Sequence, residues 1–293
     1  MAVTAGGGGG VGWYRNRRRY ITAVEETSDR DQARAALVAL SRALGEPARD
    51  FAVLGEGNTS VALADGTFYV KASGSSLPTL TAGDLCRVRC APCLAAVDAA
   101  DERSEEEVAA LLQTSLVDAS QPRPSVETFL HAACLRAGAT WVGHTHMTSA
   151  LALLCGPGGA TVYRRHLFPD AIVVCGLHVA AVPYVDPGLA LARAVDAELT
   201  RFAAAHGRPP KLLLLENHGV VALGRTAREV LDIHVMTDKW SRALAGAIAA
   251  GGPRYLPDEE AARIDARLDE AYRRRRLAAA TALSTTRPAA ADG

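Results

Sequence analysis

Apolar residues recur at every third or fourth position in several segments, a spacing that predicts amphipathic helices. Residues 29–45 form one such segment, and Gly45 is a typical helix terminator. Residues 124–138 have Pro124 near the start and Gly138 after the end, which is the asymmetry expected of a helix. Further helices are predicted at residues 147–156, 187–207, 226–252 and 258–276.

Apolar and polar residues alternate in other, shorter segments, as they do in half-buried strands. Residues 61–74 contain Asp65 and Gly66 between two such segments, which is the signature of a hairpin. Residues 211–224 predict a strand, a tight polar turn and a second strand. Residues 98–122 are polar and irregular, and we expect a loop with one helical turn there. The other predicted strands are residues 84–90, 140–146, 171–176 and 178–185.

Strands and helices follow one another without an internal repeat or a convincing linker, so we expect a single domain. The predicted fold class is α/β, with a central, mostly antiparallel β-sheet flanked by helices on both faces. We assign the domain to residues 31–278. We expect a flexible N-terminal tail at residues 1–30 and a disordered C-terminal tail at residues 279–293.

Charge and composition argue against several classes of protein. The chain has 32 basic and 32 acidic residues, so no net charge favours binding to nucleic acid or to an anionic membrane. We recognise neither a secretory signal nor an uninterrupted apolar run of about 18 residues, so no membrane span is predicted. Six cysteines among 293 residues do not suggest a disulfide framework, and we expect a cytoplasmic protein.

Two histidines lie two residues apart in the predicted strand 140–146. Side chains with this spacing point to the same face of a strand, so His144 and His146 are expected side by side. They form half of a metal site, or else a pair of polar side chains hydrogen-bonded in a cleft. His218 follows an apolar strand in the turn ENHG, where a side chain can be directed into a cleft and complete a catalytic metal site. The other histidines, including His131, are interpreted as isolated, surface or packing residues.

Five short motifs, in order, resemble those of the class II aldolase and adducin family. This family contains fuculose- and rhamnulose-phosphate aldolases and ribulose-phosphate 4-epimerases. The resemblance covers roughly residues 30–275, and it implies a class II aldolase-like fold. The motifs are GNTS (57–60), KASG (71–74), PSVE (124–127), HTH (144–146) and ENHG (216–219).

The resemblance implies a role for each matching position. His144, His146 and His218 would bind a divalent metal, usually Zn²⁺ in the family, although Mn²⁺, Co²⁺ and Fe²⁺ also suit histidine ligands. Glu127 would be the general acid and base, whereas its predicted position in the first turn of a helix would by itself suggest only a favourable contact with the helix dipole. The residues that would bind a substrate phosphate are Gly57, Asn58, Ser73, Gly74 and Ser125.

One position departs from the family pattern. Several aldolases have two serines before the glutamate, whereas here Ser125 is followed by Val126, which removes one hydroxyl from the expected phosphate pocket. The substrate could therefore be unphosphorylated or carry a different charge. Lys71 could add a cation to the pocket, but a lysine in a strand is more often solvated. Tyr163 and Tyr184 are candidates for the tyrosine that some family aldolases use as a proton donor.

The activity implied by the resemblance is reversible aldol cleavage of a short ketose, such as a ketose 1-phosphate, to dihydroxyacetone phosphate and an aldehyde. A divalent metal would stabilise the enediolate that remains when the carbon–carbon bond breaks, so no lysine Schiff base is needed. The same fold also supports 4-epimerases, decarboxylases and dehydratases, and adducin heads that carry no chemistry. The expected partners are a small sugar or sugar phosphate and, as is common in the family, other copies of the chain in a homotetramer.

A third class of protein is suggested by three cysteines. Cys86, Cys90 and Cys93 have the spacing found in radical S-adenosylmethionine enzymes, whose cysteines hold an iron–sulfur cluster. In the simpler interpretation, which we favour, Cys86 and Cys90 are small side chains on one face of a strand and Cys93 lies in the following loop.

Overall fold

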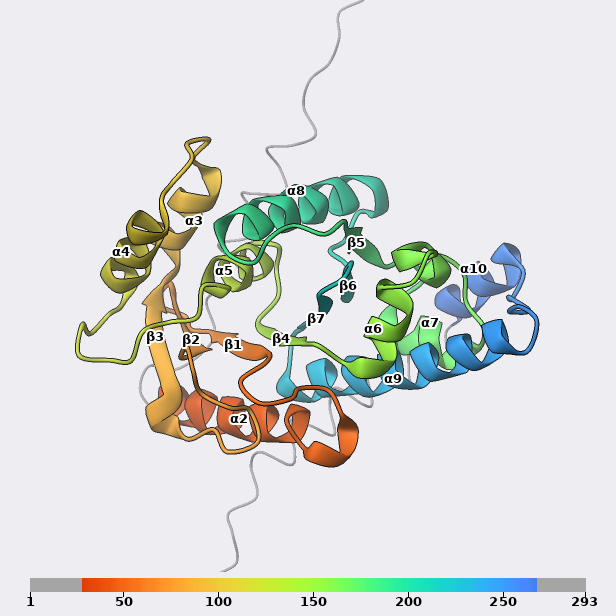
Figure 1. Cartoon of the computed structure of the whole chain (residues 1–293), viewed down its shortest axis with the longest axis horizontal. Coiled ribbons are helices and arrows are strands. Elements are labelled where there is room, and N and C mark those ends of the chain that lie inside the picture. The colour runs from red at the N-terminus through yellow and green to blue at the C-terminus, as the bar shows by residue number, and fades with distance from the viewer. Residues whose placement is uncertain (1–27, 268–293) are drawn as a thin grey trace, which may run out of the picture.

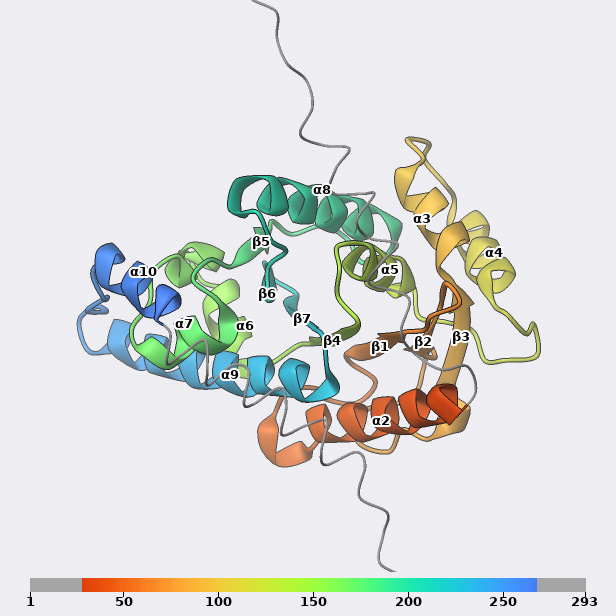
Figure 2. The same cartoon turned by 180° about the vertical axis from the view of Figure 1, so that it is seen from behind.

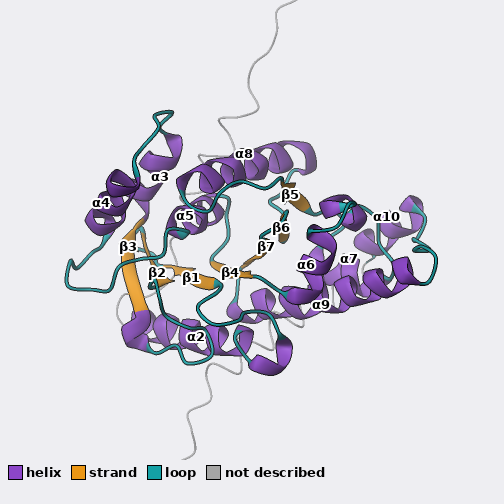
Figure 3. Ribbon diagram, in the orientation of Figure 1, coloured by secondary structure: helices purple, strands orange, loops and turns teal. Residues whose placement is uncertain are grey.

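A seven-stranded β-sheet forms the centre of the molecule (Figure 1 and Figure 3). The computed structural model describes residues 28–267. The strands are β1 (Asn58–Ala62), β2 (Thr67–Lys71), β3 (Leu85–Arg89), β4 (Trp141–Thr145), β5 (Ala180–Val182), β6 (Leu212–Leu215) and β7 (Gly219–Gly224). Their order in the sheet is β3-β2-β1-β4-β7-β6-β5, and only the β5–β6 pair is parallel. The prediction of a central, mostly antiparallel sheet is confirmed.

Helices cover both faces of this sheet. The helices are α2 (Ser28–Leu44), α3 (Cys90–Asp98), α4 (Glu105–Ser115), α5 (Thr128–Arg136), α6 (Thr148–Leu154), α7 (Pro169–Cys175), α8 (Leu189–His206), α9 (Ala227–Ala249) and α10 (Asp258–Ala266), with short 3₁₀ helices η2 (Pro47–Arg49), η3 (Ala82–Asp84) and η4 (Gly159–Tyr163). Helices α3, α5 and α8 pack together on one side of the sheet, and α2 and α9 pack on the other (Figure 1 and Figure 2). The α/β class with helices on both faces is therefore also confirmed.

Alternation along strand β6 shows how the two faces are filled. Leu213 and Leu215 belong to the apolar core beneath α5 and α8, whereas Leu212 and Leu214 belong to the core beneath α2 and α9. Successive side chains in a strand point to opposite faces, so a strand that is covered on both sides needs a continuous apolar run. This accounts for the unbroken leucines after Lys211.

The predicted hairpin is present as strands β1 and β2. Ala62 pairs with Phe68 at the closed end of the hairpin. The turn contains Gly66 in a left-handed conformation, with φ +78°, and the Thr67 backbone N–H donates to Asp65 Oδ1 at 3.1 Å. The long helices predicted from the apolar spacing are confirmed as α2, α8 and α9.

One predicted strand is wrong. Residues 171–176 belong to helix α7 and not to a strand. A short apolar run fits a buried strand and a buried helix equally well. Pro169 at the helix start and Asp170 in the first turn are typical of a helix N-terminus, and Ile172 then packs against Ile264 of α10.

Other boundaries differ in extent. Strand β5 is shorter than the predicted segment 178–185, and residues 98–122 contain helix α4, which is longer than the single turn expected. Helix α2 begins at Ser28. Residues 1–27 and 268–293 lie outside the described residues. They include most of the predicted N-terminal tail, all of the predicted C-terminal tail and the end of the predicted helix 258–276. Within residues 28–267, no helix is long and apolar enough to cross a bilayer.

Candidate metal centre

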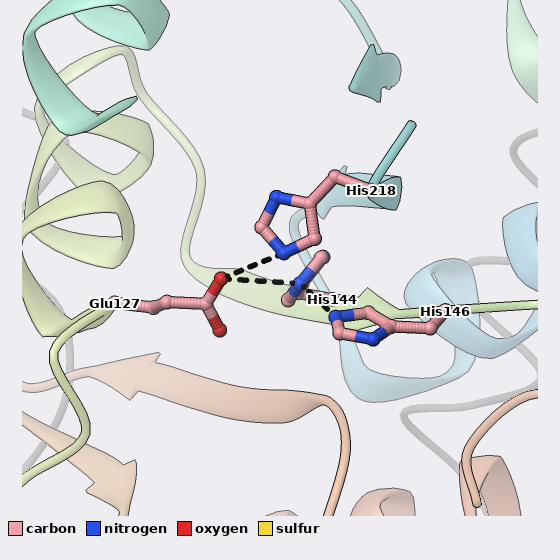
Figure 4. A group of neighbouring side chains, drawn as sticks. All are labelled: Glu127, His144, His146 and His218. Atoms are coloured by element: carbon pink, nitrogen blue, oxygen red, sulfur yellow. Dashed lines mark hydrogen bonds and ion pairs between the residues drawn. The ribbon is translucent and has the colours of Figure 1, made fainter. Parts of the chain in front are cut away.

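Three histidines and a glutamate from separate elements meet where the middle strands of the sheet end (Figure 4). His144 lies in β4, between β1 and β7. His146 follows β4 by one residue, so the expected strand ends sooner than predicted. His218 lies in the turn between β6 and β7, and Glu127 immediately precedes α5.

The ring centroids of the three imidazoles form an equilateral triangle. Each pair of ring centroids is 4.9 Å apart, and His144 Nε2 lies 3.0 Å from His146 Nε2. Glu127 Oε1 lies 3.1 Å from His218 Nε2 and 3.4 Å from His144 Nε2. The four side chains each offer one ligand atom, and these atoms all lie within 4.8 Å of one another. The structure thus brings together the three predicted metal ligands and the predicted acid–base residue, which we call the metal group.

The turn that carries His218 depends on its two neighbours. Asn217 has a left-handed backbone, with φ +54°, which asparagine tolerates better than most residues. A Cβ atom on Gly219 would lie 2.3 Å from Thr145 O of the adjacent strand, so only glycine fits there. The sequence Asn-His-Gly therefore reverses the chain tightly enough to place the imidazole beside β4.

The donor atoms of the metal group fit a divalent metal. His144 Nδ1 lies 3.0 Å from Val220 O, so a proton on Nδ1 leaves the Nε2 lone pair directed at the other rings. Burial, together with the neighbouring imidazoles of His144 and His218, lowers the pKa of His146 to about 3, so that ring is neutral. Neutral imidazole nitrogens and a carboxylate are the ligands that zinc and related metals prefer.

Glu127 occupies the N-cap position of α5 and not the first turn, where it was expected. Its side chain is buried. Burial alone would raise the pKa of the carboxyl, but His144 and His218 hold that pKa well below its usual range. Figure 4 shows the carboxylate directed at the imidazoles rather than at the end of the helix. Glu127 is therefore a charged group of this cluster.

Three buried polar side chains extend the site behind Glu127. Asn58 Nδ2 donates to Glu127 Oε2, and Asn58 Oδ1 contacts His131 Nε2. Ser60 Oγ lies 2.7 Å from His131 Nδ1. The sequence alone predicts a surface or packing role for His131. Its position four residues after Glu127, on the same side of α5, is the signal in the sequence that could have placed it here.

Two of the predicted phosphate-binding residues lie in the loop after β2. Ala72 forms a β-bridge with Pro124, and Ser73 N donates to Arg123 O at 2.9 Å. Ser73 and Gly74 are exposed. This loop is therefore held against the segment that leads to Glu127, although the backbone N–H of Ser73 already has a partner.

The other predicted phosphate-binding residues lie closer to the metal group. Gly57 has φ +69°, and a Cβ atom there would lie 2.7 Å from His144 O, so the loop before β1 lies directly against β4. Ser125 Oγ accepts a hydrogen bond from Glu127 N at 3.3 Å. The side-chain amide of Asn58 contacts Glu127, as described above. We call residues 55–58, 73–75 and 123–125 the anion loops.

Lys71 connects two of the anion loops. The expectation that this strand lysine is solvated is wrong, because its exposed fraction is 3%. Its Nζ donates to Gly55 O at 3.1 Å and to Ser75 O at 2.5 Å. Burial lowers the pKa of Lys71, while the carboxylates of Glu127 and Asp84 oppose that change. The ammonium thus links the loop before β1 to the loop after β2.

The two candidate tyrosines have other partners. Tyr163 is buried, and its hydroxyl lies 2.6 Å from Ser241 Oγ. Tyr184 has an exposed fraction of 56% and donates to Asp186 Oδ1 at 2.8 Å. The structure brings neither phenol into contact with Glu127.

The cysteine motif is divided between two elements. Cys86 lies in β3, whereas Cys90 and Cys93 lie in helix α3, so the expected strand position of Cys90 and loop position of Cys93 are both wrong. Burial raises the pKa of Cys86 and of Cys93 to about 12. All three side chains pack in or against the apolar core beneath α5 and α8, as small apolar residues do.

Comparison with known proteins assigns the fold to one family. The family model described as Class II Aldolase and Adducin N-terminal domain matches residues 35–244. The chain is also similar to the solved N-terminal class II aldolase domain of a conserved protein from Thermoplasma acidophilum. The two are 28% identical with a TM-score of 0.58, and the match covers 76% of this chain and 96% of that domain.

Two curated proteins are similar in sequence. The 3-oxo-tetronate 4-phosphate decarboxylase of Pectobacterium atrosepticum is 29% identical over 207 residues, which are 70% of this chain and 80% of that protein. The uncharacterized oxidoreductase YuxG of Bacillus subtilis is 29% identical over 181 residues, which are 59% of this chain. This chain spans only about a quarter of the length of YuxG, since the match covers 24% of that protein.

Proposed function

The chain belongs to the class II aldolase and adducin family, and from this we propose that it is a metal-dependent lyase that cleaves a carbon–carbon bond of a short ketose. In its most specific form, the reaction is reversible aldol cleavage of a ketose 1-phosphate to dihydroxyacetone phosphate and an aldehyde. The observation that carries the proposal is the convergence of three imidazoles and Glu127 within 4.8 Å. From the resemblance alone, we extend the proposal to a homotetramer, and from the cysteine content we propose that the protein is cytoplasmic.

We propose His144, His146 and His218 as the ligands of a divalent metal, with Zn²⁺ as the first choice and Mn²⁺, Co²⁺ or Fe²⁺ as alternatives. Such an ion, when bound, acts as a Lewis acid that stabilises negative charge on substrate oxygens during bond cleavage. Three protein ligands leave further coordination positions for a substrate. The orientation of the rings supports the assignment, because the Val220 carbonyl fixes one ring and Glu56 Oε1 lies 3.8 Å from His146 Nδ1.

Glu127 is proposed as the general base and acid. Its Oε2 receives the hydrogen bond from Asn58, whereas its Oε1 faces the histidines. A carboxylate held at one oxygen can accept a proton from the substrate with the other and return it in the reverse reaction. Because the side chain is buried, bulk water competes little for that proton.

The anion loops are proposed to bind the charged end of the substrate. Gly57, Ser73 and Gly74 would contribute main-chain or hydroxyl contacts, and Ser125 would contribute its hydroxyl. The link from Lys71 to two of these loops supports this assignment, since it places a cation next to them. For Asn58, the contacts of the amide with Glu127 and His131 favour a different role, which is argued below.

A second candidate reaction is decarboxylation of a phosphorylated sugar acid. The observation that favours it is the similarity to the 3-oxo-tetronate 4-phosphate decarboxylase, which extends over 80% of that protein. Decarboxylation also leaves negative charge beside a carbonyl, so it needs the same metal group. The two reactions differ in the leaving group, which is carbon dioxide in one and an aldehyde in the other.

The experiment that tests the proposal combines metal analysis with product analysis. The purified full chain should contain about one divalent ion per chain, measured by plasma emission spectrometry. It should then release dihydroxyacetone phosphate from at least one member of a panel of ketose 1-phosphates. Release of carbon dioxide from 3-oxo acid phosphates, without aldol cleavage, would show that the decarboxylase activity is correct and the aldolase activity is not. A metal-free protein that turns over neither panel would contradict the proposal and favour an adducin-like interaction module.

A further inference from the structure

We infer that His131 is a positioning residue for the general base, because it fixes the orientation of the Glu127 carboxylate through Asn58. The inference rests on the proposed function, since it takes Glu127 as the acid–base residue. It also assigns the Asn58 side chain to the proton-transfer machinery and leaves only the main chain of Asn58 to the anion loops. His131 lies one turn after Glu127 on α5, and Asn58 begins strand β1.

A continuous row of side-chain contacts leads from β1 to the carboxylate. Ser60 Oγ contacts His131 Nδ1 at 2.7 Å, His131 Nε2 contacts Asn58 Oδ1, and Asn58 Nδ2 contacts Glu127 Oε2. All four side chains are buried, with exposed fractions of 8% or less. In such surroundings an unsatisfied polar group is costly, so each contact must join a donor to an acceptor.

The donors and acceptors in this row have one consistent assignment. Asn58 Nδ2 lies within hydrogen-bond distance of Glu127 Oε2, and the amide nitrogen always carries protons, so the Asn58 NH₂ group donates to the carboxyl oxygen. The Asn58 carbonyl oxygen is then an acceptor, which requires the proton of His131 to be on Nε2. His131 Nδ1 is left as an acceptor for the Ser60 hydroxyl. Turning the Asn58 amide over would set its oxygen against Glu127 Oε2, and these are both acceptors.

The protonation state of His131 agrees with this assignment. Burial lowers the pKa of His131 to about 3, so the ring is neutral near pH 7. A neutral imidazole has one donor nitrogen and one acceptor nitrogen. That is what Asn58 on one side and Ser60 on the other require.

As a consequence, the two carboxylate oxygens of Glu127 have different roles. Oε2 is held by Asn58, whose amide in turn cannot rotate because His131 holds its oxygen. Oε1 is left to face His144 and His218, where a substrate proton would arrive. The Asn58 amide oxygen and nitrogen both have partners within this row, so its substitution should change turnover more than substrate affinity.

Kinetics of two substitutions at one position test the inference. His131→Met removes the donor at similar volume, and we expect it to lower kcat about 10- to 100-fold with KM changed less than about threefold. His131→Gln places an amide nitrogen near the position of Nε2, and we expect it to recover kcat to within about fivefold of the wild type. The matched control is His166→Met, because His166 is also a buried histidine and has its Nε2 2.9 Å from Leu177 O. The control should lower Tm and leave kcat unchanged.

A second measurement needs no substrate. In full-length protein labelled with ¹⁵N-histidine, NMR should show His131 neutral, with its proton on Nε2 and in slow exchange with water. Asn58→Ala removes the acceptor, and the Nε2 proton should then exchange faster or the two tautomers should mix. His166 in the same spectra reports whether the fold is otherwise intact.

The outcomes separate this inference from the proposed function. A proton on Nδ1 in the wild type overturns the inference, and so does a His131→Met variant with lowered Tm but unchanged kcat. Equal loss of kcat in the His131→Met and His131→Gln variants also overturns it, since the donor would then be irrelevant. A wild-type chain without activity on either substrate panel contradicts the proposed function, and in that case the NMR spectra still decide the tautomer.

Discussion

The metal group and the anion loops lie side by side, yet they are built from different parts of the chain. The metal group consists of four side chains carried by a strand, a helix N-terminus and two connections. Glu127 and His144 are buried, and His146 and His218 are half-buried. The anion loops offer mainly backbone and small side chains, and Ser73 and Gly74 are exposed. Binding by the metal group depends on which side chains are present, whereas binding by the anion loops depends on how the main chain is held.

This difference predicts where the molecule is sensitive. In the metal group, a single side chain supplies a donor that no neighbour can replace. In the anion loops, one lost hydroxyl removes one hydrogen bond among several, but loss of the support beneath the loops displaces many main-chain groups together. Lys71 is that support, since one ammonium holds a carbonyl from each of two loops.

The largest expected effect comes from His146→Ala. The remaining ligands cannot hold the metal tightly, so we expect bound metal to fall from about one ion per chain to less than a tenth. Turnover should fall by at least 10²–10³-fold, in proportion to the lost stabilisation of charge. Plasma emission spectrometry on protein dialysed against a weak chelator measures the first quantity, and initial rates measure the second.

The control for this prediction is His206→Ala. His206 also lies against another imidazole, with its centroid 4.2 Å from that of His178, but it lies at the end of α8 and outside the metal group. It should retain metal and turnover. Full metal content and full activity in His146→Ala would contradict the claim that each side chain of the metal group supplies an irreplaceable donor.

A middle-sized effect is expected from Lys71→Met. Loss of the ammonium leaves the carbonyls of Gly55 and Ser75 without their donor, which should lower the free energy of unfolding by about 1–3 kcal/mol. Because the anion loops would shift, we also expect KM to rise about tenfold for a phosphorylated substrate while metal content stays the same. Urea unfolding and steady-state kinetics measure the two effects.

The control for this prediction is Lys239→Met, which removes a mostly exposed lysine and should change neither the free energy of unfolding nor KM. An unchanged KM in the Lys71→Met variant would show that Lys71 does not hold the anion loops in their substrate-binding positions.

The order of elements and the three histidines could be predicted from the sequence because both depend on local pattern. Alternation around Asp65 and Gly66 fixes a hairpin, and His144 is carried by one of the strands so predicted. Residues 171–176 could not be assigned in this way. Their apolar run fits either element, and the packing of α7 against α10 brings together residues about 90 positions apart.

The side-chain contacts of Asn58 show the same limit within the site. The motif GNTS resembles phosphate-binding positions of the family, and that role of Asn58 stays a prediction. The structure brings the Asn58 side chain to Glu127, 69 residues later, and to His131, 73 residues later. Burial of Lys71 was missed for a related reason, because the carbonyls that accept its hydrogen bonds belong to loops whose meeting depends on the whole sheet. A contact between polar groups that are far apart in the sequence cannot be predicted from the local sequence around either group.

The smallest expected effect comes from Val126→Ser, which restores the second hydroxyl before Glu127 that the family pattern contains. Val126 has an exposed fraction of 39%, so the change removes little packing. One added neutral hydrogen bond contributes about 0.5–1.5 kcal/mol, which corresponds to a two- to tenfold lower KM for a phosphorylated substrate with kcat nearly constant. Val126→Ala removes the same apolar surface without adding a hydroxyl, and it should leave KM unchanged. If the serine and alanine variants behave alike on phosphorylated substrates, the segment before Glu127 does not contact the substrate anion, and the anion loops must be limited to the segments around Gly57 and Ser73.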